Sequence, residues 1–217
     1  MHQKFKSMTS LFIAVLAKLF SIVNPFGAVP MYLTMTAHYS ETERKKLVRN
    51  TSIYFVAILL AFFWGGAYIL SFFGLSINAL RIAGGLVILN SGFSLLNDQF
   101  AQSRAMSDAV QKEAMEKPDI SFSPLAMPML SGPGSISLLI GIFAEQENLT
   151  QRLLISTVIM LNGVIVYVVL LLAPFFYRFL GVSGLKAGSR IMSFITMAIG
   201  VQFIIGGIVA LVKSLNS

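Results

Sequence analysis

The chain has 217 residues, and its 16 Lys and Arg against 9 Asp and Glu give a net charge of +7. Apolar residues make up 56% of it and charged residues 12%, the mean hydropathy is +0.79, and there is no Cys. One soluble core of this length cannot bury so much apolar surface, which excludes disordered, collagen-like and disulfide-rich secreted classes. We expect a protein of the lipid bilayer, whose basic loop residues set its orientation, and no binding to nucleic acid.

Six nearly uncharged apolar runs predict six membrane-spanning helices. The runs cover residues 8–37, 51–73, 79–96, 121–143, 153–177 and 189–212. Each approaches or exceeds the ~20 residues needed to cross a hydrocarbon core of roughly 30 Å, and helices pair the backbone groups that lipid cannot. All 9 acidic residues lie between the runs. The sequence therefore predicts an all-α integral membrane protein, with residues 1–217 forming a single membrane domain.

Positive charge is distributed unevenly between the two sides of this predicted bundle. Residues 38–50, 97–120 and 178–188 hold nine Lys and Arg, whereas the opposite side holds four. The positive-inside rule then puts these three segments in the cytoplasm and both termini outside. Residues 97–120 are the longest polar stretch, and we expect them to form a solvated cytoplasmic linker with no chemistry of its own.

Similar interruptions occur in the apolar runs before and after this linker. Asn24-Pro25-Phe26-Gly27 interrupts the first run, and Ser131-Gly132-Pro133-Gly134 interrupts the fourth. The corresponding helix is thus broken in both halves, which indicates an internal duplication. Because three helices per unit is an odd number, the second unit must insert upside down. We predict two inverted three-helix repeats, over residues 8–96 and 121–212, with helices 1 and 4 broken at mid-membrane.

A helix break within lipid leaves backbone N–H and C=O groups unpaired, which is costly unless protein or a polar cavity surrounds them. The half-helix that begins after a break presents N–H groups and a positive dipole end, which attract a carboxylate. The half that ends there presents carbonyls, which suit a cation. The alternative is that the proline residues only bend the helices as they pack.

The residues of the two breaks are the candidate substrate-binding residues: Asn24, Pro25, Gly27, Ser131, Gly132, Pro133, Gly134 and Ser135. Asn and Ser bind polar groups but are also favoured helix caps, while Gly permits close approach of either a ligand or another helix. Candidates of second rank, for a cavity or gate, are Arg81, Arg190, Asn90, Asn162 and Gln202. The two arginines either gate the site or reach headgroups, and the three amides either line a cavity or bond between helices.

Four motifs together resemble the MarC family of six-span inner-membrane proteins of bacteria and archaea. They are Asn24-Pro25-Phe26-Gly27-Ala28-Val29-Pro30, Arg81-Ile82-Ala83-Gly84-Gly85, Pro124-Leu125-Ala126-Met127-Pro128 and Ser131-Gly132-Pro133-Gly134. The resemblance spans the whole chain, and the family includes a proposed neutral amino acid transporter subgroup. The resemblance implies a multi-pass protein of the bacterial inner membrane that transports small neutral amino acids. Together with the charge distribution, this location makes the outer side of the predicted termini the periplasm.

Enzyme motifs are absent from the sequence, which has no Gly-rich phosphate loop, no HExxH, no Gly-x-Ser-x-Gly, and no Asp, Glu or His in the apolar runs. We expect no enzyme activity, catalytic residue, metal site or cofactor. A coupling ion stays open between Na+ and H+, and the missing intramembrane carboxylates favour a cation held by backbone carbonyls.

Three hypotheses for function follow, and the oligomeric state is not predicted. The first is a secondary transporter or exporter of small neutral amino acids or similar small solutes, bound at the midplane of the broken helices. A non-transporting membrane scaffold or accessory subunit is the alternative, and a channel is the third. The concentration of polar residues at the two breaks favours one midplane site over the continuous polar path that a channel needs.

Overall fold

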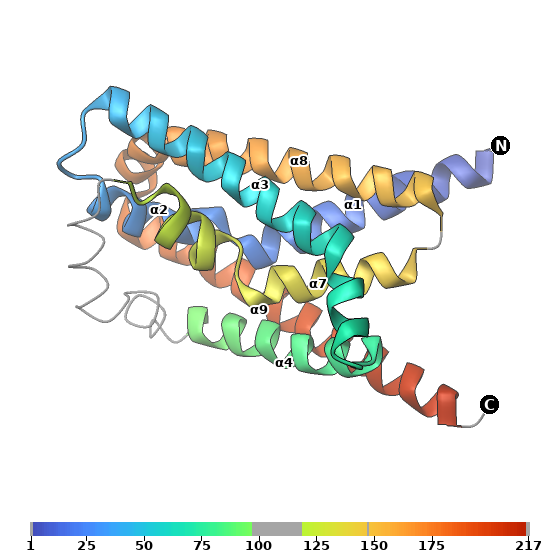
Figure 1. Ribbon diagram of the computed structural model, residues 1–217. Coiled ribbons are helices and arrows are strands. Elements are labelled where there is room, and N and C mark those ends of the chain that lie inside the picture. The colour runs from blue at the N-terminus through green and yellow to red at the C-terminus, as the bar shows by residue number, and fades with distance from the viewer. Residues whose placement is uncertain (1, 97–118, 147, 216–217) are drawn as a thin grey trace.

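The computed structural model describes residues 2–96, 119–146 and 148–215, and all regular structure in these ranges is helical (Figure 1). The elements in chain order are α1 (His2–Val23), α2 (Pro25–Met35), α3 (Glu41–Phe72), α4 (Ile77–Leu96), η1 (Ser121–Leu130), α7 (Pro133–Glu145), α8 (Leu149–Leu171) and α9 (Ala173–Leu215). The linker predicted at 97–120 lies outside the described residues, apart from Asp119 and Ile120.

The described part of the chain has five helical stretches that are long and apolar enough to cross a membrane, or six when η1 and α7 count as one bent span. One of the five, Met8–Met35, consists of α1 and α2 together. Within the described ranges, the all-helical class predicted from the apolar runs is thereby confirmed. The His2 end of α1 and the Leu215 end of α9 lie at the same end of the bundle (Figure 1), as an even number of crossings requires.

Two segments expected to separate the spans are largely helical instead. Residues 41–50 form the first turns of α3, and residues 182–188 belong to α9. The helix α3 begins early because Ser40 and Glu43 form a capping box, in which the Glu43 carboxylate accepts the Ser40 N–H at 2.8 Å. Its 32 residues extend about 48 Å, beyond a hydrocarbon core of roughly 30 Å, so the charged first turns reach past the lipid chains.

The sixth predicted span is longer than its apolar run because α9 continues through a kink. Gly181 has φ 62 and ψ −178, a conformation that only glycine adopts readily, and the helix resumes directly after it. A single residue therefore redirects the chain where the sequence predicted a connecting segment over residues 178–188.

The first half of the predicted fourth span is not a regular α-helix. Within η1, Ser123 and Met127 have extended dihedral angles. Each of them precedes a proline, Pro124 or Pro128, and the proline ring disfavours the α conformation in the residue before it. The segment η1 and the following helix α7 are bent by 65° about the break between them.

Glycines bring α4 and α9 into close contact along their length. A Cβ atom at Gly85 would lie 2.7 Å from the carbonyl oxygen of Gly200, and one at Gly200 would lie 2.7 Å from the backbone nitrogen of Leu89. Only residues without a side chain permit this approach, as in other membrane helix pairs. Elsewhere α3 packs on α8, α2 on α9 and α7 on α4.

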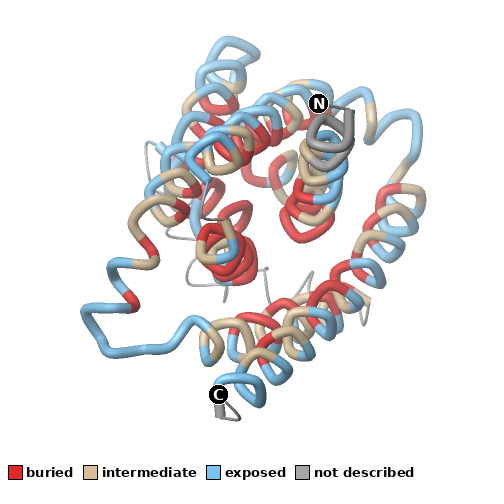
Figure 2. Tube along the Cα trace, turned by 90° about the vertical axis from the view of Figure 1, so that its right-hand side faces the viewer, coloured by how far each residue is buried: buried red, intermediate tan, exposed pale blue. Residues whose placement is uncertain are grey.

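The buried residues lie on the sides of the helices that face one another, and exposed residues cover the outer sides (Figure 2). The outer surface is nevertheless strongly apolar, since the residues Phe72, Phe179 and Phe194 are 84%, 78% and 68% exposed. Among the buried residues of the described ranges, the polar ones are Ser, Thr and Asn, and none is charged. An apolar exterior around an uncharged interior is the arrangement expected of helices in lipid.

Candidate functional site

The first break is a single residue, Asn24, between α1 and α2. It is fully buried and lies in the left-handed region, at φ 44 and ψ 65. Its side-chain oxygen accepts a hydrogen bond from the N–H of Gly27 at 3.2 Å, which caps α2. Its side-chain nitrogen donates to the hydroxyl of Ser189 on α9 at 2.8 Å. Asn24 therefore both caps one helix and ties it to another.

Pro25, the first residue of α2, creates a second need for a hydrogen bond at this break. In a continuous helix the carbonyl of Ser21 would accept the N–H of residue 25, and proline has none. The hydroxyl of Thr196 on α9 lies 2.9 Å from that carbonyl oxygen and is its donor. Helix α9 thus provides one hydroxyl for the side chain of Asn24 and another for the backbone carbonyl of Ser21.

Gly27 makes this arrangement sterically possible. A Cβ atom at this position would lie 2.9 Å from the side-chain nitrogen of Asn24 and 3.0 Å from the hydroxyl oxygen of Ser189. Any side chain there would force the hydrogen-bonded pair apart. The capping role that the sequence left open for Asn24 is therefore observed, and Gly27 provides the space for it.

The second break, between η1 and α7, is organised differently. Gly132 is the N-cap of α7 and Pro133 its first residue, and no side chain caps this helix. Ser135 is buried, and its hydroxyl donates to the carbonyl of Gly132 at 2.8 Å. The hydroxyl of Ser131 is also buried, and it has no hydrogen-bond partner in the described part of the protein. Polar groups at this break thus remain available, in contrast to those around Asn24.

The last turn of α1 lies beside the first turn of α7. A Cβ atom at Gly134 would be 3.5 Å from a methyl group of Ile22 and 3.1 Å from Ile88 of α4. Ile22 is two residues before Asn24, so the chain segments at the two breaks are in contact. The end of α1 and the start of α7 are therefore neighbours in the bundle.

The five candidates of second rank lie in other environments. Arg81 forms an ion pair with Glu145 at 2.8 Å, at the end of α7 farthest from the break, and the two side chains are 15% and 49% exposed. Asn162 is buried and donates to the carbonyl of Val158 in its own helix at 3.0 Å. The remaining three, Asn90, Arg190 and Gln202, are exposed on α4 and α9.

The sequence interpretation missed Ser189 and Thr196 as partners of the first break. A signal was present, since Pro25 leaves the carbonyl of Ser21 without a helical donor and some hydroxyl has to replace it. Which hydroxyl does so depends on the packing of α2 against α9, and these residues are 165 and 175 positions away from the groups they contact.

The long apolar helices, the apolar exterior and the uncharged interior define a multi-pass integral membrane protein. The chain belongs to the MarC family, because the model for MarC family integral membrane proteins matches residues 9–212. The family suggested by the sequence motifs is thus confirmed.

Two relatives illustrate how far the similarity extends. The chain is 39% identical to a UPF0056 membrane protein of Methanocaldococcus jannaschii over 197 aligned residues. These residues make up 91% of this chain and 95% of the relative. It is 32% identical over 222 residues to the UPF0056 inner membrane protein MarC of Escherichia coli, with 95% and 99% covered. No solved structure matches the chain.

Proposed function

We propose that this protein is a secondary transporter or exporter of small neutral amino acids or similar small solutes, which bind where the two broken spans meet. The observation that carries the proposal is the first turn of α7, where Gly134 and Ser135 are buried, no side chain caps the helix, and the neighbouring buried hydroxyl of Ser131 has no described partner. Both features are costly in a protein interior unless a ligand provides the missing acceptors.

An amino acid carboxylate has the chemistry to satisfy these groups. Pro133 has no N–H, so the donors of the first turn of α7 are the backbone N–H groups of Gly134 and Ser135. They point out of the helix start, where its dipole favours negative charge, and the hydroxyl of Ser131 adds a third donor. The equivalent position on α2 is already occupied by the side chain of Asn24, so we place the carboxylate at α7.

The amino group of the substrate requires acceptors, and η1 ends with one. Pro133 cannot donate to the carbonyl of Met129, four residues earlier, so this carbonyl has no donor of the usual helical kind. This carbonyl suits either the substrate ammonium group or a coupling cation. Ile22 and Ile88 pack closely around Gly134, which limits the size of a substrate side chain there, and the uncharged interior favours a substrate without net charge.

The arrangement of the helices supports two inverted repeats as the moving units. The broken span α1–α2 and the broken span η1–α7 run in opposite directions through the bundle (Figure 1). The contacts between the two halves also match. Helix α2 of the first half packs on α9, the last helix of the second half, and α7 of the second half packs on α4, the last helix of the first half. We infer alternating access by rocking of one repeat against the other, in the bacterial inner membrane with periplasmic termini.

The test is counterflow of radiolabelled glycine, alanine and serine in proteoliposomes that contain the purified protein. Ser131→Ala should raise the KM for exchange about tenfold, the effect of one lost hydrogen bond to a charged group. Its thermal stability should not fall, because the hydroxyl has no partner to lose. Ser121→Ala is the matched control, since Ser121 also has a buried hydroxyl without a described partner but lies at the far end of η1.

A second pair of variants tests the site by blocking it. Gly134→Leu should abolish exchange while the protein still inserts, whereas Gly206→Leu, where no atom lies within 4 Å of a built Cβ, should leave it intact. Undiminished exchange in Gly134→Leu would refute the proposed site. Failure of the wild-type protein to exchange any of the three substrates would favour the scaffold or accessory-subunit alternative.

A further inference from the structure

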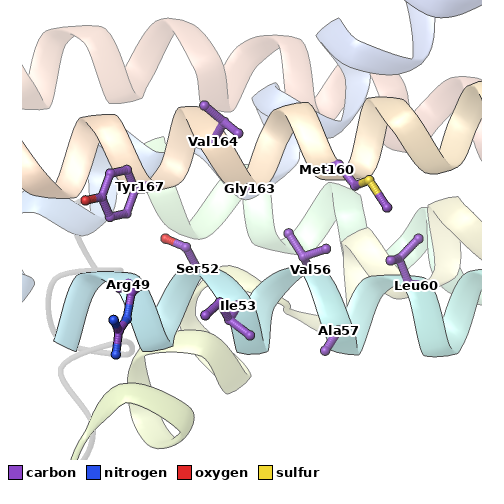
Figure 3. Close-up of a pocket in the computed structure, with 10 residues that line it drawn as sticks. All are labelled: Arg49, Ser52, Ile53, Val56, Ala57, Leu60, Met160, Gly163, Val164 and Tyr167. Atoms are coloured by element: carbon purple, nitrogen blue, oxygen red, sulfur yellow. The ribbon is translucent and has the colours of Figure 1, made fainter. Parts of the chain in front are cut away.

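An apolar groove runs along the outside of the bundle between α3 and α8 (Figure 3), on different residues from the two breaks. Its volume is about 490 Å³, and aliphatic side chains such as Val56, Leu60 and Met160 line it. Gly163 of α8 contacts Val56 of α3 and so brings the two helices together beneath the groove. A groove of this kind on a membrane-facing surface suits a hydrocarbon chain.

A polar pocket of about 390 Å³ adjoins one end of this groove. It is lined by Lys45, Lys46, Arg49 and Tyr167, and both Arg49 and Tyr167 also line the groove. Residues 45 and 46 are four and three positions before residue 49 on α3, so the three cations share one helix face. All three are exposed, and none forms an ion pair with a carboxylate in the described part of the chain.

The neighbouring Arg44, in contrast, forms hydrogen bonds within the protein. Two nitrogens of its guanidinium donate to the carbonyl of Thr36 at 2.8 and 3.0 Å, at the end of α2. Arg44 is therefore used within the fold. The three cations that follow it carry charge without such a partner, at the end of α3 where its first turns extend past the lipid chains.

The length of the groove matches the depth of one lipid leaflet. Arg49 and Leu60 are 11 residues apart on α3, which corresponds to about 16 Å along a helix, and half of a hydrocarbon core of roughly 30 Å is about 15 Å. One turn beyond Leu60, a hydrogen bond of 3.1 Å between the indole of Trp64 and the hydroxyl of Ser156 joins the two helices. The groove thus begins at headgroup level and ends near the bilayer centre.

We propose that this surface is a binding site for one anionic phospholipid. Its phosphate lies on Lys45, Lys46 and Arg49, and one acyl chain lies in the groove between α3 and α8. Free phosphate would use only the polar pocket, whereas the shared lining by Arg49 and Tyr167 makes the pocket and the groove one continuous surface. Basic pockets between membrane helices bind anionic headgroups in this way.

Trp64, the one Trp of the chain, provides a fluorescence probe at the deep end of the groove. The protein is placed in phosphatidylcholine vesicles, and phosphatidylglycerol with brominated acyl chains is titrated in to quench Trp64. We expect half-maximal quenching at a mole fraction about tenfold lower than with brominated phosphatidylcholine. Equal quenching by the two lipids would overturn the proposal.

Matched variants separate a specific site from a general effect of charge. Lys45→Gln with Arg49→Gln should bring the preference to within about twofold, since it removes two of the three cations that bind the phosphate. Arg178→Gln with Lys213→Gln removes the same charge from α9 and should keep the preference. An equal loss in both double variants would refute the site, as would an unchanged preference in the first.

A further pair of variants tests whether the groove holds the acyl chain. Ala57→Phe fills the groove from its exposed edge and should weaken quenching by phosphatidylglycerol, whereas Ala83→Phe, exposed on α4, should not.

A cysteine variant tests whether a second copy of the chain occupies the groove instead. Because the chain has no Cys, Ile53→Cys introduces a single thiol there. A disulfide-linked dimer that phosphatidylglycerol does not displace would overturn the proposal, and monomers would support it.

Discussion

Thr196 of α9 donates a hydrogen bond of 2.9 Å to the carbonyl of Ser21, the carbonyl that Pro25 leaves without a helical donor. A hydroxyl from the second half of the chain thereby completes a helix of the first half. The same hydroxyl lies 2.8 Å from the carbonyl of Met192 in its own helix, so it holds the break in place from a fixed position on α9.

Replacement of Thr196 tests whether this bond stabilises the break. Thr196→Val keeps the shape of the side chain but leaves the carbonyl of Ser21 buried and unpaired, so we expect a loss of about 1–3 kcal/mol in the free energy of unfolding. Thr196→Ser should retain most of the stability. Thermal unfolding of the purified variants in detergent measures the difference, and equal stability of the Val and Ser variants would contradict the prediction.

The conformation of Asn24 leads to a prediction about which substitutions it tolerates. At φ 44, alanine would be strained by about 1–2 kcal/mol and would also lose the cap on α2. Glycine would lose the cap but adopt the conformation freely. We therefore expect Asn24→Gly to unfold at a higher temperature than Asn24→Ala, with both below the wild type. The reverse order would show that backbone strain does not determine this position.

Close contact between α4 and α9 predicts opposite effects for two glycines of the same helix. A Cβ at Gly200 would lie 2.7 Å from the backbone nitrogen of Leu89, so Gly200→Ala must push the helices apart and cost about 1–3 kcal/mol. Gly206 has no atom within 4 Å of a built Cβ, so Gly206→Ala should be neutral or stabilising by up to about 1 kcal/mol. Chemical unfolding in mixed micelles compares the two, and a similar loss in both variants would count against this packing.

The ion pair between Arg81 and Glu145 should contribute little, despite its distance of 2.8 Å. Half of the Glu145 side chain is exposed, and exposed pairs are worth about 0.2–1 kcal/mol. We expect a coupling free energy in this range from a double-mutant cycle with Arg81→Gln and Glu145→Gln, and a decrease at high salt. A coupling above about 2 kcal/mol would assign the pair a larger role, such as a gate.

The sequence predicts the helical spans well because they depend on local properties. Apolar length identifies membrane helices, so the all-helical class and the span that forms α4 were anticipated, while proline beside glycine indicates where a helix is interrupted. The course of α9 was not, because one glycine at φ 62 redirects a helix without a polar loop. The partners of the first break depend on which distant helix packs against it, and no local pattern records that.

Asn90 shows a further limit of reading polar residues within spans. We expected it to line a cavity or bond between helices, yet it is exposed. The buried side of α4 contains Gly84, Ile88 and Gly92 at spacings of four residues. Asn90 is two positions from both Ile88 and Gly92, which puts it on the opposite side of the helix. Comparison with the small residues of the same helix would have identified its orientation, because helix faces repeat every 3.6 residues.

The guanidinium of Arg44 joins the end of α2 to the first turns of α3. A planar group held by two hydrogen bonds to one carbonyl allows little rotation between the parts it connects. Displacement of α2 at the substrate site would therefore move the helix surface that includes Arg49, one turn farther along α3. If both proposals hold, the composition of the surrounding leaflet sets the affinity for the solute, and the solute in turn sets the affinity for the lipid by the same factor.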